Sequence, residues 1–289
     1  MTSFQERRWT SHDGLSLYAR DYPAAGDGDC LPVICLHGLT RNSKDFEDIA
    51  PLIAQMGRRV IVADVRGRGQ SGRDPDPANY QPKTYARDVV GLMKELGIDR
   101  AVFLGTSMGG IITMTLAAIR PRAVAAAILN DVGPAIAPEG IARILSYAGQ
   151  PVEIRKWDDA TAYVQRTNAV AFPDYRKDDW QTMARRTFRD RDGVPVLDYD
   201  PAISVALAKP PPRLAGWIAH LLFRRLTRRR PTLLIRGALS DVISADIAEQ
   251  MQRMAPNLRR VDIPGVGHAP ALTEPEAVDA IRNFLRTVP

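Results

Sequence analysis

The strongest constraint on the fold is a regular alternation of short apolar runs with segments of helical spacing in this 289-residue chain. The runs PVICL, RRVIVAD, AVFLG and AAAILND are nearly continuous in apolar residues, and helical patterns separate them. Strands that are apolar on both sides suit a sheet that is buried on both faces, as parallel sheets are. The pattern therefore predicts an α/β protein with a mostly parallel sheet covered by helices on both faces.

The alternation is interrupted once, after Asp131, and resumes at Pro231. Between these points the sequence is mostly helical in pattern, contains several prolines and has no clear strand run. Beyond them, PTLLIRG and RRVDIPG are again typical of strands. We therefore predict a core domain from residues 1–132 and 231–289, which opens with a β-hairpin, and an inserted helical cap at 133–230.

Composition indicates an ordinary globular protein, with 45% hydrophobic residues. No apolar run approaches the roughly 18 residues that cross a bilayer, and the polar start MTSFQERRWT lacks a secretory signal, so a cytoplasmic location is expected. An extended strand between Cys30 and Cys35 would hold them too far apart for a disulfide. Both are predicted to be free thiols.

The formal net charge of +6 comes largely from one basic run, Arg224 to Arg230. This run has no interleaved aromatic residues and matches no nucleic-acid motif, so no nucleic-acid partner is expected. Cations in the last turn of a helix interact favourably with its dipole, which is the simplest explanation of the run. An acidic substrate and a membrane surface stay open as alternatives.

A candidate catalytic serine lies in the Gly-x-Ser-x-Gly pattern of residues 105–109, GTSMG. A β-favouring run precedes it and a helical pattern at 108–119 follows it. A tight strand-to-helix turn crowds the backbone, so small residues must flank Ser107. Its hydroxyl would then stand at a helix N-terminus, although the pentapeptide alone also suits an ordinary turn between a strand and a helix.

A serine hydroxyl becomes an effective nucleophile when an imidazole can take its proton. Of the four histidines, His268 follows the last predicted strand in the Gly-rich loop IPGVGHAP, which would let its side chain reach back over the sheet edge. The others suit structural or solvent-facing roles: His12 in the hairpin turn, His37 at a strand end and His220 on an inserted helix. His268 is the predicted base.

Two carboxylates could orient that imidazole. Asp131 and Asp241 each follow a predicted strand, and functional groups of parallel sheets gather at the carboxyl ends of strands. The order of elements does not choose between them.

Five motifs together, LHGLT, DVRGRGQS, GTSMGG, RGALSD and GVGHAP, resemble the α/β-hydrolase fold family over nearly the whole chain. The resemblance is strongest to esterases, lactonases and carbon-carbon hydrolases with a helical cap between strands six and seven. The family order of nucleophile, acid and histidine implies Ser107, Asp241 and His268. Asp131 matches an acid position that a minority of the family uses, and is otherwise expected to bond neighbouring backbone.

The resemblance also implies an oxyanion hole made by the backbone N–H groups of Leu39 and Met108. His37 would brace the loop that carries Leu39. Serine at position 107 excludes the haloalkane dehalogenases and epoxide hydrolases of this fold, which have an aspartate as the nucleophile at the same turn. The implied protein is a hydrolase with no cofactor, and the scattered histidines offer no metal-ligand spacing.

The expected activity is cleavage of a carboxylic ester or lactone through an acyl-enzyme on Ser107. Carbon-carbon bond hydrolysis and perhydrolysis use the same triad and stay open as alternatives. A binding protein without activity is disfavoured, because such members usually lose part of the triad.

The expected partner is a small molecule with an apolar acyl group, held in a pocket beneath the cap. Trp157, Trp180 and Trp217 are the candidate residues to line it. A stripe on the helix LAGWIAHLLFRR is predicted to pack onto the sheet domain; its members are Leu214, Trp217, Ile218, Leu221 and Leu222. Acyl chain length and oligomeric state do not follow from the sequence.

Overall fold

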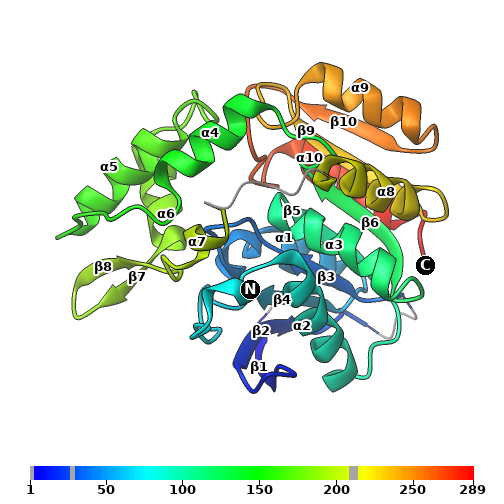
Figure 1. Cartoon of the computed structure of the whole chain (residues 1–289), viewed down its shortest axis with the longest axis horizontal. Helices are drawn as coiled ribbons and strands as arrows, with labels where there is room; N and C mark the ends of the chain where they lie inside the picture. Colours follow the sequence, from blue (N-terminus) through cyan, green and yellow to red (C-terminus); the bar gives the residue numbers. More distant parts are fainter. Residues whose placement is uncertain (1–2, 27–29, 208–213) are drawn as a thin grey trace.

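The computed structural model describes residues 3–26, 30–207 and 214–289, and its centre is one eight-stranded sheet (Figure 1). The strand order is β1-β2-β4-β3-β5-β6-β9-β10. β2 pairs antiparallel with β1 and with β4, whereas all later pairs are parallel. This confirms the predicted α/β class. The strands are β1 (Gln5–Thr10), β2 (Ser16–Tyr22), β3 (Val33–Leu36), β4 (Val60–Asp64), β5 (Ala101–Thr106), β6 (Val124–Asn130), β9 (Thr232–Gly237) and β10 (Arg259–Ile263).

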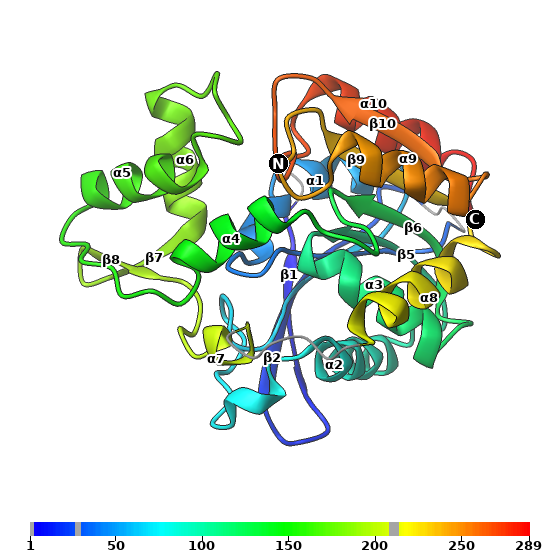
Figure 2. The same ribbon diagram turned by 45° about the horizontal axis from the view of Figure 1, so that its top comes forward.

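Both faces of the sheet are buried because alternate side chains enter two separate cores. Along β3, Ile34 and Leu36 join one core while Val33 and Cys35 join the other. Helices cover both faces, as predicted (Figures 1 and 2). The first face carries α2 (Pro82–Glu95), α3 (Met108–Ile119), α8 (Ala215–Thr227) and α9 (Ala245–Met254); the second carries α1 (Ile49–Gln55) and α10 (Pro275–Leu285).

The described part of the segment between β6 and α8, which we call the cap, forms a further layer beside the sheet (Figure 1). It contains α4 (Pro138–Tyr147), α5 (Trp157–Asn168), α6 (Lys177–Thr187) and α7 (Ile203–Leu207). It also contains a β-hairpin of β7 (Phe188–Arg191) and β8 (Val194–Leu197), which the sequence analysis missed. The available signal was Asp192-Gly193, whose positive φ angles of 52° and 84° suit a two-residue hairpin turn.

The prediction for α8 was wrong in its buried face. Phe223 and Leu226 are buried in the sheet core, whereas Trp217 is 65% exposed. Successive residues of a helix are rotated by about 100°, which places positions 214, 217, 218 and 221 opposite the Phe223–Leu226 face. Of the predicted stripe, Leu222 alone packs against the core. α8 therefore lies beside α3 in the layer of helices that covers the first face of the sheet. The sequence analysis had included it in the inserted segment 133–230.

Cys30 is exposed and Cys35 is buried, and both are free thiols, as predicted. Among residues 3–26, 30–207 and 214–289, no helix combines the length and apolar character needed to cross a bilayer.

Candidate active site

Ser107 occupies a strained turn between β5 and α3. Its backbone angles, φ 51° and ψ −114°, are rare for a residue with a side chain. A Cβ atom on Gly105 would lie 2.5 Å from the Gly109 carbonyl carbon, and one on Gly109 would clash with the Leu36 carbonyl oxygen. Only glycine fits at both positions, so the Gly-x-Ser-x-Gly pattern forms the expected strand-turn-helix.

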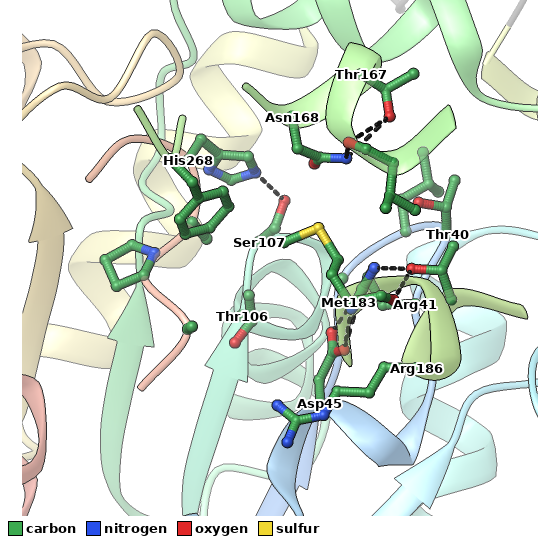
Figure 3. A pocket seen from close by; sticks show the side chains of 18 of the residues that line it. Thr40, Arg41, Asp45, Thr106, Ser107, Thr167, Asn168, Met183, Arg186 and His268 are labelled. Atoms are coloured by element: carbon green, nitrogen blue, oxygen red, sulfur yellow. Dashed lines mark hydrogen bonds and ion pairs between the residues drawn. The ribbon is translucent and has the colours of Figure 1, made fainter. Parts of the chain in front are cut away.

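His268 connects Ser107 to a carboxylate. It lies in the loop after β10, and its Nε2 atom is 3.0 Å from Ser107 Oγ (Figure 3). Its Nδ1 atom is 2.8 Å from Oδ2 of Asp131. Because a carboxylate accepts hydrogen bonds, Nδ1 carries the proton and Nε2 is left to accept one from the serine.

Asp131 follows β6 directly and is fully buried, with a positive φ of 53°. Its Oδ1 accepts the Gly237 N–H at 3.0 Å, and its Oδ2 accepts the Ser240 hydroxyl at 2.5 Å. The Ser240 oxygen itself accepts the N–H groups of Val242 and Ile243, so its proton is directed to Asp131. Three donors, including His268, therefore hold this carboxylate in place.

Asp241 does not contact the imidazole, so the preference for it over Asp131 was wrong in geometry. Its carboxylate is bound by Arg143 of α4, with Nε–Oδ2 at 2.5 Å and Nη2–Oδ1 at 2.8 Å. Burial raises the pKa of Asp241, but the bonds from Arg143 outweigh this, and the pKa lies below its ordinary value. The loop after β9 presents Ser240 to the site and Asp241 to the cap.

The two predicted oxyanion donors, Leu39 and Met108, belong to segments that meet at the serine. Leu39 and Ser107 line the same cavity, and a Cβ atom on Gly38 would be 3.8 Å from the Ser107 Cβ. Met108 is the first residue of α3, where a helix offers its N–H no intrahelical acceptor. Leu39 and Met108 are therefore close to the nucleophile, and their role as oxyanion donors stays a prediction.

His37 is fully buried and connects the loop that carries Leu39 to the loop after β4. Its Nδ1 is 2.7 Å from the Gly38 carbonyl oxygen, and its Nε2 accepts the Val65 N–H at 3.0 Å. Both ring nitrogens are used in these bonds, which matches the predicted structural role. Burial lowers the pKa of His37 to about 4.

This buried imidazole is expected to make stability depend on pH. Between the ordinary histidine value of 6.5 and about 4, the unfolded chain binds a proton at His37 that the folded chain does not. Stability is then lost as pH falls through this window, by at most roughly 1.4 kcal/mol per pH unit. Urea unfolding of wild type and His37→Gln at pH 7.5, 6 and 5 measures it. Equal slopes in both proteins would contradict the prediction.

A cavity of about 370 Å³ opens above Ser107 and His268 and is walled by the cap (Figure 3). Its wall carries apolar side chains, as expected from the sequence, among them Phe172 and Met183, but it also includes charged ones. Arg41 Nε lies 2.9 and 3.0 Å from the two Asp45 oxygens, and Arg186 pairs with Asp48 at 2.7 Å. The cap segment also contributes four tyrosines: Tyr147, Tyr163, Tyr175 and Tyr199.

The three predicted tryptophans do not line this cavity. Trp180 is buried in the core of the cap, 5.0 Å from the Tyr175 ring. The Trp157 ring lies under Arg185, 3.6 Å from its guanidinium carbon, and Trp217 faces away on α8. Trp180 thus fills the interior of the cap, whereas tyrosine, apolar with a polar tip, suits a wall between core and cavity. The tyrosines of the inserted segment were therefore the signal in the sequence for the residues that line the cavity.

Comparison with known proteins agrees with this fold. The family model for the alpha/beta hydrolase fold matches residues 32–275. The chain is 32% identical over 257 residues to the 3-hydroxybutyrate-oligomer hydrolase of Cupriavidus necator, covering 87% of each chain. It is 29% identical over 258 residues to the 2-(acetamidomethylene)succinate hydrolase of Mesorhizobium japonicum, covering 88% of this chain and 87% of the relative.

Among solved structures, an alpha/beta hydrolase from Novosphingobium aromaticivorans superposes with a TM-score of 0.90 at 41% identity. The match covers 99% of both chains. This confirms the resemblance noted in the five sequence motifs, and the chain therefore belongs to the α/β hydrolase fold family.

Proposed function

We propose that this protein is a serine hydrolase that cleaves a carboxylic ester or lactone through an acyl-enzyme on Ser107. The observation that carries the proposal is the continuous chain of contacts from Ser107 Oγ through His268 to the buried carboxylate of Asp131. Nucleophile, base and orienting acid stand in hydrogen-bond reach in the order that acyl transfer requires.

In the first half of the reaction, Ser107 Oγ attacks the carbonyl carbon while its proton passes to His268 Nε2. The carbonyl oxygen becomes an oxyanion and accepts the N–H groups of Leu39 and Met108. When the tetrahedral intermediate collapses, the bond to the leaving alkoxide breaks and His268 returns the proton to it. The alcohol of an ester leaves, whereas that of a lactone stays attached to the opened chain, and in both cases the acyl group remains on the serine.

In the second half, water attacks the acyl carbon and gives a proton to the same Nε2 atom. The bond to Ser107 Oγ breaks, the proton returns to the serine, and the free acid leaves. Asp131 keeps the proton of His268 on Nδ1 and stabilises the imidazolium that forms in each half. The hydrogen bonds from Ser240 and Gly237 hold that carboxylate while the charge beside it changes.

The cavity supports a substrate with polar groups along its acyl portion. Its volume of about 370 Å³ is near the lower end for small-molecule sites, and tyrosines stand among the apolar residues of its wall, a residue type that can offer hydrogen bonds which an alkyl chain would not use. Hydroxy acids oligomerise through ester bonds, so the name of the Cupriavidus relative supports a hydroxyacyl ester. Short hydroxyacyl esters are the proposed class.

A fluorophosphonate probe tests the serine mechanism without knowledge of the substrate. We expect wild type to be labelled on the peptide that contains Ser107, and Ser107→Ala to remain unlabelled. A panel under identical conditions then tests the bond: a 3-hydroxybutyryl ester, butyryl and decanoyl esters, a lactone, a vinylogous diketo acid, and peracid formation from acetate and peroxide.

The hydroxyacyl ester is expected to give the highest kcat/KM, with the decanoyl ester at least tenfold lower. Faster cleavage of the diketo acid than of every ester and lactone would replace the proposal by carbon-carbon bond hydrolysis, and dominant peracid formation would replace it by perhydrolysis. Absence of labelling, together with no turnover of any ester or lactone, would contradict the serine mechanism itself.

A further inference from the structure

Arg68 is a buried arginine that the proposed reaction does not use. It lies in the loop after β4, and its side chain is among the largest that are fully buried. Its guanidinium donates to three oxygens: the Leu39 carbonyl at 2.9 Å, the Arg66 carbonyl at 2.8 Å and the Tyr85 hydroxyl at 3.0 Å. The remaining nitrogen, Nη2, lies 3.6 Å from the Met108 sulfur.

The charge of Arg68 has no carboxylate partner in the part of the chain that the structure describes. Arg66, two residues earlier and equally buried, shows the contrast. It binds three carboxylates, those of Asp13, Asp74 and Asp88. Burying a cation without a carboxylate partner is costly. A reason is therefore needed why Arg68 lacks the partners that Arg66 has.

The Tyr80 and Tyr85 rings hold the guanidinium without neutralising it. The guanidinium carbon lies 5.6 Å from the Tyr80 ring centroid and 5.1 Å from that of Tyr85. Ring faces and carbonyl oxygens solvate a cation but leave its net charge in place. In this water-poor setting its field reaches the neighbouring groups with little screening.

Those neighbours are the two residues whose N–H groups are the proposed oxyanion donors. Arg68 bonds the carbonyl oxygen of Leu39, in the loop after β3, and contacts the side chain of Met108, at the start of α3. We propose that Arg68 is the positioning residue of the oxyanion hole: it links the two elements that carry the donors and places an uncompensated positive charge behind them. This inference rests on the proposed serine hydrolase function.

The loop that carries Arg68 is held by backbone bonds as well as by the Arg68 side chain. Two of them lie near its start: Arg68 N–H to the Val65 carbonyl at 3.0 Å and Gly67 N–H to the Gly72 carbonyl at 2.8 Å. The cap adds two more, from Gly69 N–H to the Asp198 carbonyl at 2.8 Å and from Asp200 N–H to the Gly67 carbonyl at 2.7 Å. Side-chain replacement can therefore test the charge while the loop is retained.

The test compares Arg68→Met and Arg68→Lys in the full chain, using the best ester of the panel and a trifluoromethyl ketone of the same acyl group. The ketone forms a tetrahedral adduct with Ser107, so its inhibition constant reports binding of the oxyanion. Arg68→Met is expected to lower kcat about 30- to 100-fold with KM changed less than about threefold, a smaller effect than loss of a donor itself. The inhibition constant for the ketone should rise by the same factor as kcat falls.

Arg68→Lys keeps the charge but loses the geometry, and about a three- to tenfold loss in both quantities is expected. Tyr85→Phe is the matched control, because it removes one hydrogen bond to Arg68 and leaves ring and charge. Its kcat should stay within about threefold of wild type.

Near-UV circular dichroism and thermal unfolding establish that each variant is folded. A folded Arg68→Met with kcat and ketone affinity within twofold of wild type would overturn the proposal, as would a loss that falls entirely on KM. If Arg68→Met does not fold, Arg68→Lys decides: values within twofold of wild type for both quantities overturn it. A wild-type protein that neither cleaves esters nor binds the ketone would instead contradict the serine hydrolase function, and the Arg68 proposal with it.

Discussion

Replacing Ser107 by alanine is expected to lower kcat for the best ester by about 10⁴- to 10⁶-fold, because binding and the oxyanion donors remain but the nucleophile is lost. The fold should be kept. Ser107 bonds its neighbours mainly through the backbone, including its N–H to the Asn130 carbonyl at 3.0 Å and its carbonyl to the Gly110 N–H at 2.9 Å. Initial rates measure the loss of kcat, and a thermal unfolding curve on the same preparation shows whether the fold is kept.

His268→Ala should show a loss of similar size, and the double variant should lose little more than either single one, because nucleophile and base act as a unit. His220→Ala is the matched control. Its Nδ1 lies 2.8 Å from the Gly216 carbonyl oxygen of its own helix, and among the described residues its ring makes no other hydrogen bond, so kcat should not change measurably. A multiplicative loss in the double variant would show that the two residues act independently and would remove the basis of the mechanism.

Asp131→Asn is expected to be the second large effect, with kcat lowered about 10⁴-fold, as for the corresponding change in the serine-protease template. An amide at this position offers an N–H to Nδ1 of His268, which favours the tautomer that carries its proton on Nε2. That tautomer cannot accept the proton of Ser107. The same substitution leaves the steric shape of the buried site nearly unchanged, so the effect should appear in kcat more than in stability.

Asp241→Asn is the matched control for this prediction, because it makes the same chemical change in the loop after β9. Asp241 pairs with Arg143 of the cap and not with the imidazole, so a loss below tenfold is expected. Both variants are to be assayed with the same ester after each is shown to be folded. A larger loss in Asp241→Asn would return the acid to the family position that the motif order favoured.

The sequence by itself determined the local features of this protein. Alternating apolar runs predicted the mostly parallel sheet, because burial on both faces leaves its mark on each strand separately. Ser107 and its flanking glycines were recognisable because a strand-turn-helix is set by residues adjacent in the chain. His268 was identifiable from its Gly-rich loop after the last strand, and the structure places it 3.0 Å from Ser107.

Only the tertiary structure decided which carboxylate meets His268. Asp131 and Asp241 both follow strands that end at the same sheet edge, and β6 and β9 are neighbours there. Whether Ser240 or Asp241 faces the site depends on the turn of one loop and on Arg143, which lies 98 positions away in the chain from Asp241. The tertiary structure also decided which aromatic rings of the cap fill its core and which reach the cavity, because this depends on how the helices pack. Contacts between distant residues leave no local pattern in the sequence.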